Sequence, residues 1–412
     1  MKNYNEDHLL KIVKKIVKKQ LSSDNVHITL GKGSEKLDGF MGEILTIHTV
    51  DQDTQKSLEL IAKISLKDEK IRNYTAIAQS YKNEIQAYEE FFPALQEMRN
   101  DFKISQPIKS LVKFYHASET QNEEYIIMEN IKMKGYEMLP VRHLLNNEEV
   151  KLIFESYGEL HASSLALKAL HPKKFQEITG QNVSVFRLIL DMKISKDVAY
   201  SMTSIRDVMK EKCFEHVLLN KYTEDTIGIL KKKMDFRGEK YVSFTHGDGW
   251  SNNIMFKYEV RNGQRSLSDI KLLDWQAWSV GPPVIDIMFC LFSSCSKEVF
   301  ENLDTHIESY YESLTKTLML YNLKAEEIYP FQEMQRQLEQ HYHYPAIFGM
   351  MIRKIRSFDE NHSIDPVNYS SNDDSTFFDA VRDIKFDKDY LFENLKYVFD
   401  FLDKKTNKNY DI

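Results

Sequence analysis

One segment, FTHGDGWSNNIMF at residues 244–256, contains several residues of the types that take part in catalysis or bind a metal ion. There an acid, Asp248, precedes an amide, Asn253, by five positions, and a run of apolar residues typical of a β-strand follows. A second strand-like run, LSDIKLLDW, carries another acid, Asp274, near its end. The segment between the two runs, RNGQRS, contains Asn-Gly, the strongest short signal for a hairpin turn. The sequence therefore predicts an antiparallel hairpin with polar side chains at its open end.

In an antiparallel hairpin, paired residues lie equally far along the chain from the turn. The midpoint between Asn253 and Asp274 falls between Gly263 and Gln264, inside the predicted turn, so we expect these two residues to lie near each other. Asp248 lies in the loop that enters the same end of the hairpin. Two carboxylates and one amide oxygen are thus predicted to converge.

Oxygen ligands without a cysteine or histidine pair suit Mg²⁺, which takes few protein ligands and shares phosphate oxygens of a substrate. Asn253 and Asp274 are therefore predicted to bind Mg²⁺, and Asp248 to orient a hydroxyl and take its proton. This arrangement suits phosphoryl transfer, in which the protein mainly positions the reactants and neutralises charge. The alternative is that Asn253 merely begins a strand and that Asp274 ends one.

A second candidate site combines a lysine and a glutamate earlier in the chain. On the predicted strand 57–66, Lys63 lies on the face opposite the apolar residues. In the predicted helix 75–95, Glu84 lies at the edge of an apolar stripe that must face the core. A carboxylate there is costly unless it is paired, and Lys63 is the expected partner. A lysine held in this way can bind the α- and β-phosphates of ATP; the alternative leaves both side chains on the surface.

The elements that must position these residues fall into two groups. Strands dominate the first part of the chain, and helices dominate from about residue 145, interrupted by a β-rich island at 241–274. The sequence predicts an α+β fold with a small antiparallel-sheet lobe, residues 1–130, and a larger helical lobe, residues 131–412, with an inserted hairpin. Residues 1–21 fit an amphipathic helix docked on the surface of the protein, with binding to a membrane surface as the alternative. An active site is expected in the cleft between the lobes.

Composition excludes several classes of protein. The chain of 412 residues is too long for one simple core. Its 55 basic and 62 acidic residues give a net charge of −7, which does not suit binding to nucleic acid. Three cysteines, none in a CxxC pair, indicate reduced thiols and a cytoplasmic protein. The longest apolar run, VIDIMFCLF, is too short to span a membrane.

Taken in order, Lys63, Glu84, the YIIMEN segment, HGDGWSNN and LLDWQ resemble the kinase-like small-molecule phosphotransferases. These include choline kinases and aminoglycoside phosphotransferases, which share a two-lobed, protein-kinase-like fold. The pattern HGD-x-W-x-NN, a hairpin, D-[FW]-Q and P-x-x-D (Pro283 to Asp286) most closely resembles the ecdysteroid-kinase-like family. The resemblance extends over about residues 30–350.

The resemblance implies a role for each matching residue. Asp248 would be the catalytic base, while Asn253 and Asp274 would bind magnesium and Lys63 with Glu84 would bind the phosphates of ATP. The segment formed by Glu129, Asn130 and Ile131 would meet adenine through its backbone. His246 and Asp286 would brace the catalytic loop. Two departures stand out: Gly249 replaces a bulkier residue, and the glycines of segment 30–43 (Gly31, Gly33, Gly39 and Gly42) match a phosphate-binding loop only loosely.

The acceptor is indicated by aromatic residues. Trp250, Trp275 and Trp278 all lie in the candidate catalytic stretch, where they could wall a pocket for a flat apolar alcohol or a quaternary ammonium, or simply pack beneath the loop. A second aromatic segment, residues 339–352, suits a wall of the same pocket. The resemblance favours an ecdysteroid or another hydrophobic alcohol as substrate. The alternatives are a choline or ethanolamine kinase and a catalytically silent ligand-binding member of the family.

Overall fold

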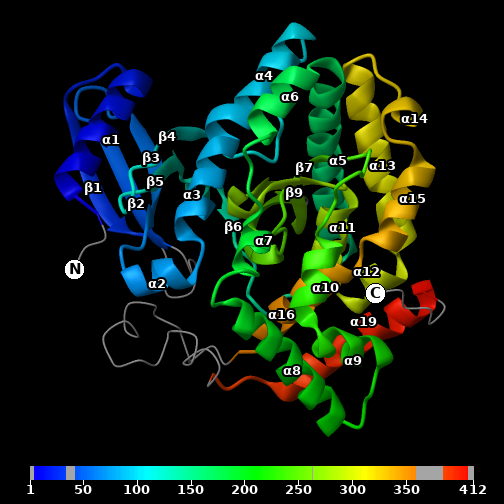
Figure 1. Ribbon diagram of the computed structural model, residues 1–412. Helices are drawn as coiled ribbons and strands as arrows, with labels where there is room; N and C mark the ends of the chain where they lie inside the picture. Colours follow the sequence, from blue (N-terminus) through cyan, green and yellow to red (C-terminus); the bar gives the residue numbers. More distant parts are fainter. Residues whose placement is uncertain (1–3, 34–41, 262, 359–383, 407–412) are drawn as a thin grey trace.

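An antiparallel sheet stands at one end of the molecule, and helices form most of the remainder (Figure 1). The computed structural model describes residues 4–33, 42–261, 263–358 and 384–406. The first elements are α1 (Glu6–Leu21), β1 (Val26–Lys32), β2 (Gly42–Asp51), β3 (Ser57–Ser65), α2 (Glu69–Tyr74), α3 (Ile77–Gln86), the π-helix η1 (Ala87–Phe91), α4 (Phe92–Asp101), β4 (Phe114–Ser118) and β5 (Tyr125–Glu129).

The later elements are mainly helical. In order they are the 3₁₀ helix η2 (Ile131–Lys134), β6 (Tyr136–Glu137), α5 (Asn147–Leu170), α6 (Pro172–Thr179), α7 (Val185–Ile189), α8 (Ser195–Glu211), α9 (Val217–Glu224), α10 (Thr226–Lys233), β7 (Ser243–Thr245), η3 (Ser251–Asn253), β8 (Ile254–Arg261), β9 (Gln264–Leu272), η4 (Trp275–Ala277), β10 (Ser279–Gly281), α11 (Val284–Ser294), α12 (Lys297–Glu301), α13 (Leu303–Leu320), α14 (Ala325–Ile328), α15 (Phe331–Gln340), α16 (His343–Arg356) and α19 (Lys388–Thr406). Among the described residues, no helix is both long and apolar enough to cross a bilayer.

The five-stranded sheet has the order β1-β2-β3-β5-β4, and all of its neighbouring strands are antiparallel. On β3 the side chains alternate: Leu60, Ala62 and Ile64 are buried on one face, and Lys63 points to the other. Helix α1 covers the apolar face with its own buried side chains, which are Leu9, Val13, Ile16 and Val17. The prediction that the N-terminal segment is a docked surface helix is therefore confirmed. The opposite face of the sheet is left to form one wall of a cleft.

The predicted helix at 75–95 is three elements, because a π-helical turn, η1, separates α3 from α4. Pro93 lies at the start of α4, where its missing N–H is tolerated. These helices pack into the core of the helical part and not into the cluster formed by α1 and the sheet. Asn83 joins α3 to that part: its Nδ2 donates to the carbonyl of Gln276 (3.1 Å), and its own carbonyl accepts from Trp278 Nε1 (2.7 Å). A boundary between lobes after residue 130 stays a prediction.

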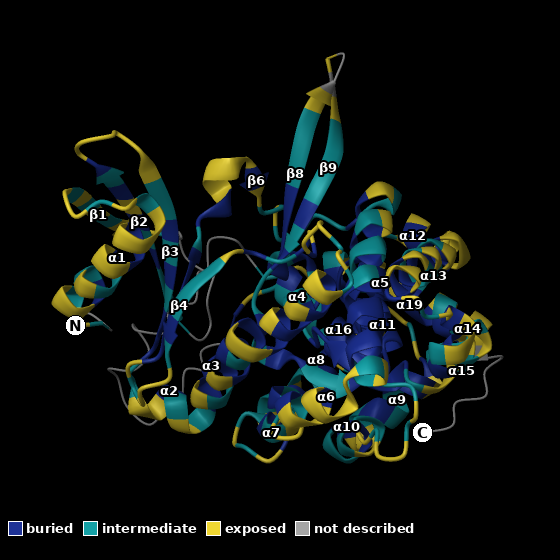
Figure 2. Cartoon of the chain, turned by 90° about the horizontal axis from the view of Figure 1, so that it is seen from above, coloured by how far each residue is buried: buried dark blue, intermediate teal, exposed yellow. Residues whose placement is uncertain are grey.

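The β-rich island contains the predicted hairpin, formed by β8 and β9, which projects from the molecule together with β6 (Figure 2). Its register differs by one residue from the predicted one. Ile254 pairs with Leu272, so Asn253 lies opposite Leu273, whose N–H donates to the Asn253 carbonyl (2.8 Å). The two ends of the hairpin therefore meet, with Asp274 one position farther along.

The position of the turn and a bulge together set this register. Next to the turn Arg261 pairs with Gln264, which is two positions away from the predicted register; the shift between Lys257 and Tyr258 adds one residue on the β9 side and restores one of the two. In the turn, Gly263 has φ +76°, a conformation that suits glycine. Asn262 lies outside the described residues.

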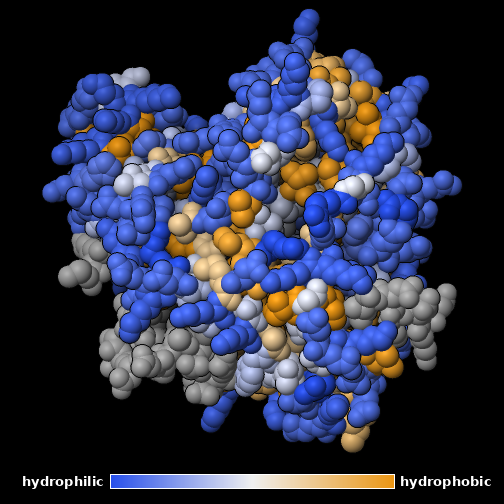
Figure 3. Space-filling view, in the orientation of Figure 1, coloured by the Kyte–Doolittle hydropathy of each residue, from blue (hydrophilic) through white to orange (hydrophobic). Residues whose placement is uncertain are grey.

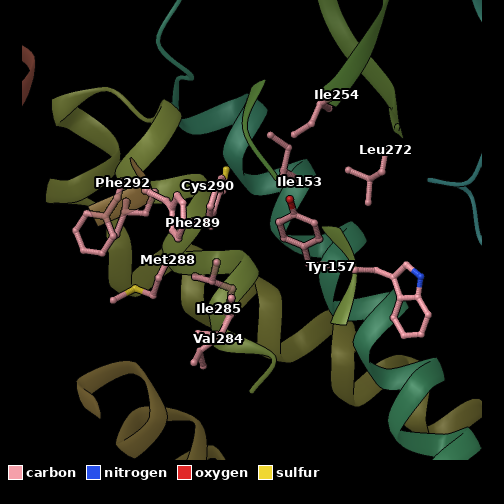
Figure 4. Packing of buried hydrophobic residues seen from close by; sticks show 14 of the residues in the cluster. Ile153, Tyr157, Ile254, Leu272, Val284, Ile285, Met288, Phe289, Cys290 and Phe292 are labelled. Carbon is pink, nitrogen blue, oxygen red and sulfur yellow. The ribbon is translucent and has the colours of Figure 1, made fainter. Parts of the chain in front are cut away.

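The core of the helical part surrounds the base of the hairpin. Figure 4 shows Ile153 and Tyr157 of α5 between the strand ends, marked by Ile254 and Leu272, and the apolar residues of α11. Every residue of α11 is buried. The hairpin is thus held at its base, where the candidate site residues lie.

Candidate active site

A cleft of about 440 Å³ lies between the uncovered face of the sheet and the helical part. Hydrophobic residues are exposed on the face shown in Figure 3 along the junction of these two parts. Residues from both sides line the cleft, including Lys63 and Glu84 on one side and Asp248, Asn253 and Asp274 on the other. The structure therefore brings all five predicted residues to one cavity.

Lys63 links the two sides of the cleft. Its Nζ lies 2.6 Å from Glu84 Oε2 and 2.5 Å from Asp274 Oδ1. Burial lowers the pKa of Lys63, but the charges of Asp274 and Glu84 outweigh this effect and raise the pKa well above its usual value. Glu84 is only 1% exposed, and its burial raises the pKa of its carboxyl group, opposed by Lys63. The lysine thus holds a positive charge against two carboxylates from different elements.

Asp274 has a strained backbone at the point where β9 ends and η4 begins. Its φ of 63° and ψ of 65° lie in the left-handed region, which residues other than glycine rarely adopt. Such strain is typical of functional positions that the surrounding structure holds in place. One carboxylate oxygen binds Lys63, and the other accepts a hydrogen bond from Gln276 Nε2 (3.1 Å).

Asp248 and Asn253 are joined directly. Asn253 Nδ2 donates to the carbonyl of Asp248 (2.8 Å) and to its carboxylate Oδ2 (3.0 Å). These two bonds turn the amide nitrogen toward Asp248, which leaves the amide oxygen directed away from it. Burial raises the pKa of the Asp248 carboxyl group well above its usual value, and the negative charge of Asp274 adds to this effect. The carboxylate is therefore a stronger proton acceptor than an exposed aspartate.

A buried carboxylate holds the loop that carries Asp248. Asp286, at the start of α11, accepts the N–H groups of His246 (2.7 Å) and Gly247 (2.9 Å). His161 Nε2 lies 3.0 Å from the same carboxylate. Gly247 has φ +82°, and a Cβ there would lie 2.3 Å from the carbonyl oxygen of Ala277, so only glycine fits.

The His246 ring connects this loop with the hairpin. Its Nε2–H donates to the carbonyl of Leu273 (2.8 Å), and its Nδ1 accepts the N–H of Asp248 (3.3 Å). Burial lowers the pKa of His246, so the ring is held in the neutral form that these two bonds require. The ring thereby fixes the distance between the segment of Asp248 and that of Asp274.

Three contacts of the loop were not anticipated from the sequence. A Cβ on Gly249 would lie 2.0 Å from the hydroxyl oxygen of Tyr157, which explains the small residue at this position. Farther along the loop, Ser251 Oγ accepts from Arg356 Nη1 (2.6 Å), and the Ser251 N–H donates to Ser294 Oγ (3.0 Å). Each contact joins residues far apart in the chain, so no local pattern could reveal it.

The segment predicted to meet adenine lies where β5 passes into η2. Glu129 and Ile131 line the cleft, whereas Asn130 is 6% exposed and caps η2 by accepting from the N–H of Lys132 (3.2 Å). The Glu129 side chain pairs with Lys134 (2.7 Å). Ile131 is the first residue of η2, a position whose N–H has no partner within the helix.

Two of the four glycines in segment 30–43 line the cleft. These are Gly33 and Gly42, whereas Gly31 lies in β1 and is not part of the lining. Gly39 lies outside the described residues. The structure therefore supports a close approach of backbone to the cleft at the two ends of this segment.

Of the three tryptophans, one lies in the cleft and two lie in the core. Trp250 is partly buried and lines the cleft. Trp275 and Trp278 are fully buried and pack against aromatic residues such as Phe244, so they do not form a wall of the acceptor pocket. Their indoles fill the space beneath the loop, as the alternative prediction of simple packing has it. Of the three tryptophans, Trp250 is the one that could still form a wall of the acceptor pocket.

Most of the apolar wall comes from elements that carry no recognisable motif. Helices α7 and α8 contribute residues of which Phe186, Ile189 and Val198 are examples. Helix α16 contributes Phe348 and Met351, which belong to the aromatic segment noted in the sequence. Short helices such as α7 have no signature of a binding site, so their role follows only from the tertiary fold.

The donor atoms at the base of the hairpin suit Mg²⁺. Asn253 offers an amide oxygen and Asp274 a carboxylate, both on the cleft, and Mg²⁺ favours such a small set of oxygen ligands. The adjacent Asn252 Oδ1 is buried without a hydrogen-bond partner among the described residues. Within the same residues, no group of three or more histidines, cysteines and acids could bind a metal ion. The site therefore fits a metal ion that shares oxygen ligands with a substrate and does not fit a closed structural metal centre.

The antiparallel sheet, the mainly helical part and the cleft between them form a two-lobed, kinase-like fold. The chain matches the ecdysteroid kinase-like family over residues 36–323, well over half of its length, and it belongs to this family of small-molecule kinases. No curated protein matches the sequence.

Solved structures similar to this chain include two small-molecule kinases. One is a GDP complex of an aminoglycoside 2′-phosphotransferase, with 11% identity, a TM-score of 0.43, and coverage of 98% of this chain and 100% of that chain. Another is a glucosamine kinase, with 10% identity, a TM-score of 0.36, and coverage of 95% and 84%. A glucosamine kinase in complex with glucosamine, ADP and inorganic phosphate gives 8% identity and a TM-score of 0.32, with coverage of 95% and 82%.

Proposed function

We propose that this protein is an ATP- and Mg²⁺-dependent kinase that phosphorylates a hydroxyl group of a small hydrophobic molecule, such as an ecdysteroid or a related secondary alcohol. The observation that carries the proposal is the position of Lys63, which contacts Glu84 of α3 and Asp274 beside the hairpin at once. Asp248 and Asn253 line the same cleft. A cation, two oxygen ligands and a buried base in one cavity are the groups that phosphoryl transfer requires.

In this proposal, residues 1–130 hold the nucleotide and residues 131–412 hold the acceptor. Lys63, fixed by Glu84, binds the phosphates, and the backbone around Ile131 meets adenine. Asn253 and Asp274 would hold Mg²⁺, which would supply positive charge to neutralise the phosphates of ATP. His246 and Asp286 hold the loop in place and do not touch the substrate.

The transfer step follows from the position of Asp248. The acceptor oxygen attacks the γ-phosphorus of ATP and forms a new O–P bond, while the bond from that phosphorus to the β–γ bridging oxygen breaks and ADP leaves with the electron pair. Asp248 accepts the proton of the hydroxyl group. Burial supports this role because it raises the pKa of the Asp248 carboxyl group.

The lining of the cleft supports a hydrophobic acceptor. Phe186, Ile189, Phe348 and Met351 expose apolar surface there, and such surface stabilises a bound molecule by about 25 cal/mol for each Å² removed from water. The three cysteines are free thiols, which fits a reducing compartment such as the cytoplasm. We therefore place the reaction in the cytoplasm.

The proposal is tested by measuring ADP formation with Mg·ATP against a panel of ecdysteroids, plant secondary alcohols and choline. We expect turnover with hydrophobic alcohols and little with choline. Turnover with choline or ethanolamine alone would instead support the choline-kinase alternative. A Mg²⁺-dependent increase in melting temperature with ATP, but no turnover of any alcohol, would overturn the proposal in favour of a catalytically silent binding protein.

A further inference from the structure

Lys354, on α16, is a buried lysine of the cleft that the proposed reaction does not use. It lines the cavity and is 7% exposed. Its ammonium group lies 5.3 Å from the ring centroid of Tyr200 and 5.3 Å from that of Phe386. Among the described residues it has neither a carboxylate nor a hydrogen-bond acceptor as partner.

The neighbouring arginines on α16 differ from Lys354 in their hydrogen bonding. Arg353 donates to the carbonyls of Phe292 (2.5 Å) and Cys295 (2.8 Å), and Arg356 donates to Ser251 Oγ (2.6 Å). Both arginines therefore have polar partners within the fold. Within the described part of the chain, the Lys354 ammonium group contacts two aromatic rings, which offset a small part of the cost of burying a charge.

The pKa of the Lys354 amine reflects this environment. Burial lowers the pKa of Lys354 to about 8, and no neighbouring carboxylate opposes the effect. The amine therefore still carries its proton at neutral pH, in a place where a charge is unfavourable. A buried charge on the wall of a cavity, without an ionic partner among the residues that the structure describes, is typical of a group that binds a ligand.

The surroundings determine which ligand would fit. The part of the cleft formed by α7, α8 and α16 is mainly apolar, with Ile189, Val198, Met351 and Ile352 among its walls. The polar residues of α8 in the lining are Tyr200, Ser201 and Asp197, and Asp197 accepts a hydrogen bond from the Tyr74 hydroxyl. In such a region of low dielectric constant, an ammonium group attracts an anion and repels a cation much more strongly than in water. The geometry therefore disfavours quaternary ammonium compounds and polycationic sugars.

Resting on the proposed function, we infer that the acceptor is a hydrophobic alcohol that also carries an anionic group, a carboxylate or a sulfate, and that Lys354 binds this group. The apolar walls hold the body of the molecule, and its hydroxyl group faces Asp248. Lys354 thus determines which alcohols are accepted and takes no part in the transfer of the phosphoryl group.

The test compares matched pairs of acceptors, each a hydroxylated sterol acid and its methyl ester, with wild type and the variant Lys354→Met. Wild type is expected to prefer the acid. In the variant, KM for the acid should rise about ten- to hundredfold, the range for losing a hydrogen bond to a charged group, with KM for the ester and for ATP unchanged. Lys354→Arg should restore much of the preference. Lys240→Met is the control, because Lys240 also lies over a tyrosine ring but outside the cleft.

Calorimetry with a non-hydrolysable ATP analogue separates this inference from the proposed function. If the acid binds more tightly than the ester and loses this advantage in Lys354→Met, the inference holds even without turnover. Equal effects of the variant on acid and ester would overturn it, whether or not the protein is a kinase. An increase in KM for ATP instead of the acid would also overturn it, because Lys354 would then act on the nucleotide.

Discussion

At the scale of single residues, Asp248 is the side chain on which the proposed chemistry depends most directly. Asp248→Ala, or the more conservative Asp248→Asn, should lower kcat by about 10²- to 10⁴-fold, the usual contribution of a general base. The affinity for ATP should change little, because Lys63 and the metal ligands remain. Steady-state kinetics and nucleotide titration measure the two effects. Unchanged turnover would contradict the role of Asp248, and the exposed Asp304→Asn serves as control.

Lys354 gives a prediction that needs no substrate. Its pKa of about 8 when folded lies below the 10.5 of an unfolded lysine, so the unfolded chain binds more protons between these two values. Stability of the wild type should therefore rise with pH across that window, and the full cost of the buried charge remains below pH 8. Lys354→Met should raise the free energy of unfolding by about 1–3 kcal/mol at pH 7. Denaturant titrations should show that the difference in free energy of unfolding between Lys354→Met and wild type is smaller at pH 9.5 than at pH 7. A difference that does not change with pH would contradict this prediction.

At the scale of elements, the hairpin shows what a sequence can and cannot specify. Alternating residues and the Asn-Gly turn predict two paired strands, and the pairing of β8 with β9 follows from them. The bulge beside Lys257 could not be predicted, because Lys257 also pairs with Tyr136 of β6, a strand more than a hundred residues earlier. Register depends on that third strand as well as on the local pattern.

The contact between the catalytic loop and α5 can be tested by a pair of substitutions. Gly249→Ala would place a methyl group 2.0 Å from the Tyr157 hydroxyl oxygen, and such overpacking costs about 1–3 kcal/mol. Tyr157→Phe removes that oxygen, which has no hydrogen-bond partner among the described residues, so it should cost little alone. The double variant should recover part of the stability. Additive losses in unfolding experiments would show that the two residues do not meet.

At the scale of the whole molecule, the order of the strands and helices could be predicted from the sequence. The charged residues that line the cleft could be predicted as well. Lys63 and Glu84 could be predicted as partners because a buried acid requires a nearby cation. The apolar wall could not, since Phe186 and Val198 lie on helices whose faces are assigned only once the chain is folded. The burial of Trp275 and Trp278 could not be predicted either. An aromatic residue gives the same sequence pattern whether it packs in a core or lines a pocket.

If a nucleotide binds between the two parts of the molecule as proposed, it should stabilise the protein in a way that depends on Mg²⁺. Mg·ATP at a hundred times its Kd should stabilise the protein by about 2.7 kcal/mol, and EDTA should remove most of this effect. Asp274→Ala should weaken the binding of Mg·ATP itself, so its shift in melting temperature at the same concentration should be much smaller. A full shift in Asp274→Ala, measured by thermal unfolding, would show that the metal ligand lies elsewhere.

The lysine that spans the cleft has one more consequence. Because Lys63 contacts Asp274 Oδ1 and Gln276 donates to Oδ2, both oxygens of this carboxylate already have a partner. Under the proposed function, Mg²⁺ at Asp274 would compete with one of these partners, and the phosphates of ATP would offer Lys63 an alternative counter-charge. Free Mg²⁺ offers Lys63 none, so the ion alone should bind weakly and should bind more tightly together with ATP.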